Sequence, residues 1–133
     1  MQGIKKTIIA ALGYLLIAFP LGYIWHLILF KDAYEAFGVY TRPHPIIPLG
    51  ALCAIIQGLI LAYLYPRWRG DGARLPSAFK FFLLMGLFYA SGTVIAVAAK
   101  SQIANLPLWF GLNFAFHFLQ FSLTALVFAA VFD

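Results

Sequence analysis

The stretch Leu108 to Phe132, LWFGLNFAFHFLQFSLTALVFAAVF, decides the fold of this chain. As a helix rising about 1.5 Å per residue, it is long enough to cross the roughly 30 Å hydrocarbon core of a membrane. Four polar residues within it lie at spacings that bring them onto one helical face. They are Asn113, His117, Gln120 and Thr124. An imidazole and two amides inside a membrane need partners, so we expect the rest of the chain to pack around this face.

The composition supports a membrane protein along the whole chain. Of 133 residues, 64% are hydrophobic and 10% are charged, and the mean hydropathy is +0.93. A soluble domain carries roughly 25% charged residues, which it needs to cover its surface. We therefore expect one membrane domain over residues 1–133, with no soluble domain attached.

The apolar runs predict an all-α, polytopic bundle of four transmembrane helices joined by short loops. The expected spans are residues 4–30, 46–65, 78–99 and 108–132. The first span begins like a signal peptide, but its apolar run continues to Phe30 without a small-residue cleavage site, so we expect it to be retained. In the first loop, Asp32 and Glu35 have the spacing of a capping box, which predicts a short interfacial helix.

Small residues follow one face of each of the first three spans, which allows neighbouring helices to approach closely. Examples are Ala11, Gly58 and Gly86. Each such face also carries a polar residue, and together with the fourth span these predict a polar seam that holds the helices together by hydrogen bonds. By depth the seam divides into His26, Thr93 and Asn113 in one tier, and Gln57, His117 and Gln120 in a central tier.

His117 also allows a functional interpretation, as a metal or haem ligand, a proton acceptor or a quinone contact. The only other histidine within a span is His26, and the two differ in depth by about 8 Å, which is a poor arrangement for two ligands of one iron. We expect no cofactor and no metal, with haem as the alternative. Cys53 is the only cysteine, so neither an intrachain disulfide nor a CxxC motif exists.

The net charge of +5 reports topology rather than nucleic-acid binding, because the basic residues lie between the apolar runs. Six belong to the amino-terminal segment and the second loop: Lys5, Lys6, Arg67, Arg69, Arg74 and Lys80. Three belong to the first and third loops: Lys31, Arg42 and Lys100. The asymmetry predicts a multi-pass protein with both termini in the cytoplasm.

The first loop contains a rigid segment, Thr41 to Pro45. Its Arg42 and His44 are candidates for binding the outer surface of a partner, and a solvated loop is the alternative. With Lys31, Asp32 and Glu35 nearby, a small charged cluster is expected there.

Several segments resemble small bacterial four-helix integral membrane proteins of unknown function. They are WHLILFK at Trp25–Lys31, RPHPII at Arg42–Ile47, QG at Gln57–Gly58 and LYP at Leu64–Tyr65–Pro66. The resemblance implies the same four-span layout in the inner (cytoplasmic) membrane of a bacterium. It implies no activity and no site residues.

No enzymatic site is expected, because the spans contain no acidic residue, no Ser-His-Asp group can be assembled there, and no phosphate-binding loop is present. The leading hypothesis is a structural or accessory subunit of a membrane assembly, whose partners are the bilayer and other membrane chains or copies of itself. A small transporter or channel with a His117-centred polar path is the alternative, and a haem- or quinone-binding redox subunit is the third. Several aromatic residues are expected to face lipid or a partner: Phe82, Phe88, Phe114, Phe118 and Phe121.

Overall fold

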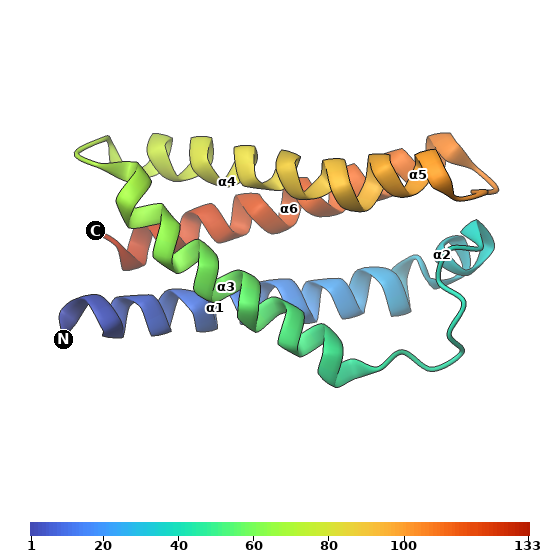
Figure 1. Ribbon diagram of the computed structural model, residues 1–133, viewed down its shortest axis with the longest axis horizontal. Coiled ribbons are helices and arrows are strands. Elements are labelled where there is room, and N and C mark those ends of the chain that lie inside the picture. The colour runs from blue at the N-terminus through green and yellow to red at the C-terminus, as the bar shows by residue number, and fades with distance from the viewer.

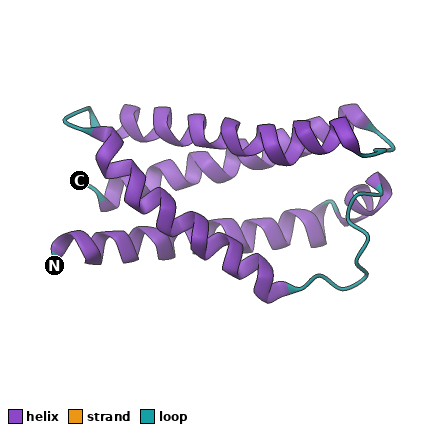
Figure 2. Ribbon diagram, in the orientation of Figure 1, coloured by secondary structure: helices purple, strands orange, loops and turns teal.

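The computed structural model describes all residues from 1 to 133, and it consists of helices and loops (Figures 1 and 2). Four helical segments are long and apolar enough to cross a membrane. The first is α1 (Gln2–Ile24) continued by the π-helical turn η1 (Trp25–Leu29), and the second is α3 (Ile47–Arg69). The third joins α4 (Arg74–Ala90), the π-helical turn η2 (Ser91–Ile95) and α5 (Ala96–Lys100), and the fourth is α6 (Leu106–Val131). The predicted all-α fold with four spans is confirmed.

The largest extensions of the helices beyond the predicted spans are at the end of α3 and the start of α4. The second span was expected to end at about Tyr65, and its helix α3 continues through Pro66 to Arg69, followed by Gly70, whose φ of 55° suits glycine. The next helix starts at Arg74 instead of residue 78. Hydropathy locates only the apolar part of a helix, whereas the basic residues at these ends remain helical and reach beyond the hydrocarbon layer.

The short helix predicted in the first loop is present as α2 (Lys31–Phe37), but the predicted capping box was wrong. Phe30 precedes the helix, no side chain caps it, and Asp32 lies inside the first turn. Glu35 instead pairs with Lys31 one turn away, at 3.5 Å. The helix ends at Gly38 in the left-handed conformation, with φ of 77°.

The two ends of the bundle differ in what they carry (Figure 1). Both chain termini and the loop between α3 and α4 lie at one end, which we call the basic end because the six basic residues named above belong to it. Helix α2 and the loop between α5 and α6 lie at the other, the α2 end. In this view α4 runs alongside α6, whereas α3 crosses α1 obliquely.

Aromatic side chains fill the space between α4 and α6. Phe82 and Phe121 are 0% and 3% exposed, so the prediction that they face lipid or a partner was wrong. They lie on the faces that these two helices turn toward each other, which the sequence of one helix alone cannot identify. Phe88 and Phe118 are 75% and 64% exposed, and Phe114 is half-buried.

Close packing of α1 and α3 depends on a glycine, as the small-residue pattern predicts. A Cβ atom on Gly58 would lie 2.9 Å from the carbonyl oxygen of Ala11 and 3.2 Å from its Cα atom. The two backbones are therefore in direct contact at this crossing. Away from it, toward the α2 end, the helices diverge (Figure 1).

Candidate functional site

The divergence of α1 and α3 leaves a cavity of about 860 Å³ on the α2 side of their crossing. Its walls are mainly apolar and aromatic. Residues of α4 and α6 also contribute to its lining. The aromatic lining consists of Phe19, Tyr23, Tyr34, Tyr40, Tyr89 and Phe116. The polar lining includes His26, Arg42, Gln57 and Gln120.

Two glycines keep the cavity open. A Cβ atom on Gly22 would meet only the ring of Phe116, at 3.8 Å, and one on Gly50 would meet only the ring of Phe19, also at 3.8 Å. Both positions line the cavity, so a larger side chain there would occupy its space. Pro43 and Pro45 belong to the loop that lines the cavity, and their fixed φ angles stiffen this loop, which bends at Pro43 and His44.

A three-helix relay of hydrogen bonds lies at the floor of the cavity. The Nε2 group of Gln120 donates to the Oη atom of Tyr14 at 2.9 Å. Tyr14 in turn donates its hydroxyl hydrogen to the Oε1 atom of Gln57 at 2.6 Å. The relay joins α6, α1 and α3, and the amides predicted for the central tier meet through a tyrosine rather than directly.

A second network anchors α2 to the bundle. Trp25 donates its ring N–H to the Tyr34 hydroxyl at 3.2 Å, and Tyr34 donates to the Oδ1 atom of Asn113 at 3.1 Å. The Asn113 amide nitrogen donates to the Trp109 carbonyl at 2.8 Å. Burial raises the pKa of Tyr34, so its hydroxyl remains a donor at physiological pH.

His117 is buried away from the large cavity. Its Nε2 atom lies 3.4 Å from the Thr93 hydroxyl, and its Nδ1 atom is buried without a partner. It lines a smaller, apolar crevice of about 240 Å³ between α4 and α6, together with residues such as Gly86 and Phe118. The structure thus pairs His117 with Thr93, which the sequence placed in the other tier.

His26 bonds within its own helix. Its Nδ1 atom lies 2.9 Å from the Gly22 carbonyl oxygen, and its ring packs on Tyr34 and Phe116 at centroid distances of 4.4 and 4.7 Å. No hydrogen bond joins it to Thr93 or Asn113, its expected neighbours. It belongs to the cavity wall.

Sequence reasoning missed Tyr14, Tyr34 and Trp25, which link the predicted polar residues. Aromatic residues count as apolar in hydropathy, yet each of these carries one O–H or N–H group that needs a partner when buried. These aromatic residues lie at about the same membrane depth as an amide on another span. That coincidence of depth was the signal from which their hydrogen bonds could have been predicted.

The two π-helical turns coincide with these polar groups. In η1 the Phe30 N–H bonds to the Trp25 carbonyl five residues earlier, at 3.1 Å, next to His26. The turn η2 contains Thr93. Such turns disturb the regular ladder and occur frequently at functional sites.

The loop residues Arg42 and His44 are both exposed, and Arg42 lies at the cavity mouth. The expected charged cluster is reduced to the ion pair of Lys31 and Glu35. No group of three or more His, Cys, Asp or Glu side chains could hold a metal ion. Cys53 is exposed and lines the cavity.

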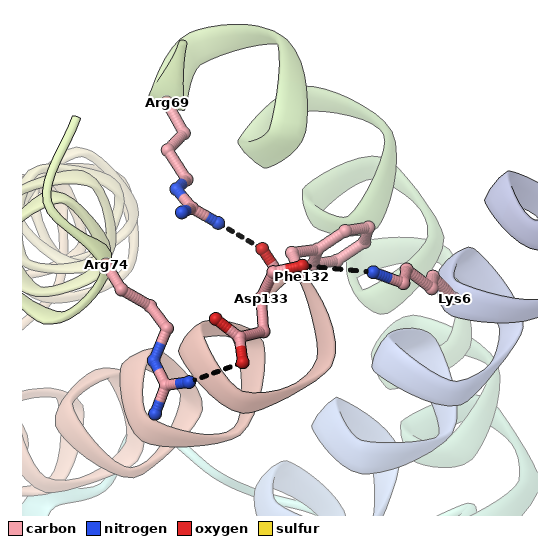
Figure 3. Close-up of polar contacts among 5 residues, drawn as sticks. All are labelled: Lys6, Arg69, Arg74, Phe132 and Asp133. Atoms are coloured by element: carbon pink, nitrogen blue, oxygen red, sulfur yellow. Dashed lines mark hydrogen bonds and ion pairs between the residues drawn. The ribbon is translucent and has the colours of Figure 1, made fainter. Parts of the chain in front are cut away.

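The basic end is tied together around the end of α6 (Figure 3). Lys6 of α1 donates to the main-chain oxygen of Asp133 at 3.2 Å, and Arg69 of α3 donates to the carbonyl of Phe132. Arg74 of α4 pairs with the Asp133 carboxylate at 2.8 Å. All four long segments therefore meet at this end.

Comparison with protein-family models, with curated proteins and with solved structures finds no match for this chain. The cavity and its polar floor are therefore the basis for the function proposed below.

Proposed function

We propose that this protein is a membrane-embedded binding protein whose cavity takes up one lipid-soluble, amphipathic molecule. The cavity of about 860 Å³ carries the proposal. Its size, its apolar and aromatic walls and its few polar groups are those of small-molecule sites in proteins.

The position of the cavity supports uptake from the bilayer. It lies between two membrane-spanning helices, and its lining includes the exposed apolar residues Tyr23 and Leu49, at 46% and 58% exposure. A ligand dissolved in the hydrocarbon layer could therefore enter sideways between α1 and α3. At the mouth, Arg42 and the ion pair of Lys31 and Glu35 would meet the polar end of an amphipathic molecule.

We also propose that the basic end faces the cytoplasm of a bacterial cell. The distribution of six basic residues at that end and three at the other supports this orientation. The role of an accessory subunit stays a prediction, which copurification of partner chains from native membranes under mild detergent tests. For the transporter alternative, His117 is not among the residues that line the large cavity.

A space-filling substitution tests the binding function. Gly50→Phe places a ring inside the cavity, and Leu52→Phe adds the same ring to an exposed position two residues away on the same helix. Native mass spectrometry of protein released from its own membranes should show a bound amphipathic molecule on the wild type and on Leu52→Phe, and none on Gly50→Phe. Equal ligand occupancy of all three proteins, or none on any of them, would contradict the proposal.

A further inference from the structure

The relay at the cavity floor fixes the direction of the Gln57 amide. Gln120 approaches Tyr14 with an N–H group, so the hydroxyl oxygen of Tyr14 accepts and its single hydrogen is free to donate to Gln57. Gln57 must therefore turn its carbonyl oxygen toward Tyr14. Its NH₂ group then points away from Tyr14, on the side of the cavity that Gln57 and its hydrogen-bond partner Tyr89 both line.

The depth of Gln57 decides which ligand atom suits this NH₂ group. Gln57 lies about 15 Å along α3 from the first residue, Ile47. The charged residues of the cavity, Lys31, Glu35 and Arg42, come instead from α2 and the following loop. The NH₂ group carries two hydrogens, and Tyr89 can accept only one of them, so the other is available to a ligand. A charged ligand atom would be costly at this depth, so a neutral acceptor such as a carbonyl oxygen is favoured.

The walls above Gln57 suit a flat ring. Phe19 and Phe116 line the cavity beside Gly50 and Gly22, which have no side chains to cover these rings. Tyr89 adds a third ring and a hydroxyl to the cavity lining. Aromatic faces and edges stack favourably on a planar conjugated system, whereas a flexible acyl chain gains no such geometric preference.

From this geometry we infer that the ligand belongs to the quinone class: a planar ring whose carbonyl oxygen accepts a hydrogen bond from the Gln57 amide. The apolar tail of such a molecule would leave the cavity between the diverging helices α1 and α3. The inference rests on the proposed function and specifies its ligand. It concerns binding alone and assigns no redox step to the protein.

The test measures binding of decylubiquinone to the full chain in lipid nanodiscs by quenching of tryptophan fluorescence. Trp25 is a suitable reporter, because its ring packs against the cavity residue Phe116 at a centroid distance of 5.8 Å. Gln57→Met removes the donor at nearly constant length and should weaken binding about five- to tenfold. Tyr14→Phe removes the hydroxyl that orients the Gln57 amide, and it should weaken decylubiquinone binding about threefold.

Thr124→Val is the matched control, because Thr124 is buried on the same polar stripe of α6 and bonds only to the Gln120 carbonyl of its own helix. Its affinity for decylubiquinone should equal that of the wild type. Melting temperatures of all variants, measured without ligand, separate lost binding from lost folding.

Two further probes test the ligand class. Methyl palmitate has a carbonyl without a ring, and dodecylbenzene has a ring without a carbonyl, so both should bind more weakly than decylubiquinone. If dodecylbenzene binds as tightly, or if folded Gln57→Met keeps full affinity while Gly50→Phe loses it, the quinone inference is overturned and the binding function stands. If Gly50→Phe also binds every probe like the wild type, the proposed function fails as well.

Discussion

The two ends of this bundle differ in how closely the same four helices pack. At the basic end, large aromatic side chains fill the interior, among them Tyr65, Phe82 and Phe128, all fully buried. At the α2 end, α1 and α3 diverge around a cavity of about 860 Å³. The α2 end also contains a small core, in which Trp109 and Phe37 are 0% and 2% exposed. The two ends therefore differ in how closely α1 and α3 pack, with the contact between Ala11 and Gly58 as the boundary.

Close packing away from the cavity explains how so small a chain can keep the cavity open. Packed interiors tolerate few voids, and each void costs stability. The aromatic core and the polar contacts around the end of α6 hold the basic end together, so the α2 end can remain open. The network of Trp25, Tyr34 and Asn113 then limits the opening by fixing α2.

The largest effect is expected from opening a void in the packed end. Phe82→Ala should lower the free energy of unfolding by about 3 kcal/mol, because it removes a ring that is completely enclosed. Phe88→Ala, which removes an exposed ring from the same helix, should change it little. Denaturant titration in mixed micelles compares the two, and equal losses would contradict the assignment of the core.

The second largest effect is expected at the contact between α1 and α3, which is the boundary between the two ends. Gly58→Ala should destabilise the protein by about 1–3 kcal/mol, because its Cβ atom would press on the backbone of Ala11 and neither helix can yield locally. Gly111→Ala is the control, since nothing lies within 4 Å of a Cβ atom at that position. A melting temperature of Gly58→Ala equal to that of the control would show that the helices are not in contact there.

A smaller effect is expected at the α2 anchor. Tyr34→Phe should cost about 1 kcal/mol and increase hydrogen exchange in α2, because it leaves the buried Asn113 oxygen without its donor. Since burial raises the pKa of Tyr34 above its ordinary value of 10.0, the wild type should keep α2 protected below pH 10 and lose protection as pH rises beyond it. Unchanged exchange in the variant would argue against the anchor.

The smallest effect belongs to the exposed ion pair of Arg74 and Asp133, whose side chains remain 45% and 68% exposed. Arg74→Gln should destabilise the protein by about 0.5 kcal/mol at low salt, and the difference should vanish at high salt. Thermal unfolding at two ionic strengths measures this. A large loss that is independent of salt would mean that Arg74 has a packing role.

Much of the fold could be predicted from the sequence because apolar runs report burial in lipid directly. The polar residues Gln57, His117 and Gln120 were recognisable for the same reason, since they interrupt those runs. The common partner of the two glutamines was not, because the hydroxyl of Tyr14 belongs to a residue that counts as apolar. The cavity could not be predicted, since it arises from the angle at which α3 crosses α1 rather than from a local pattern.

The chemistry of Cys53 offers the most direct test of an open cavity that takes up a ligand. Cys53 is the only cysteine, lines the cavity and is exposed. The measurement is the rate of its reaction with N-ethylmaleimide in nanodiscs, with and without decylubiquinone. The account predicts that ligand slows the wild-type reaction, and that Gly50→Phe slows it without ligand while Leu52→Phe does not. A rate that neither the ligand nor Gly50→Phe changes would contradict the central claim.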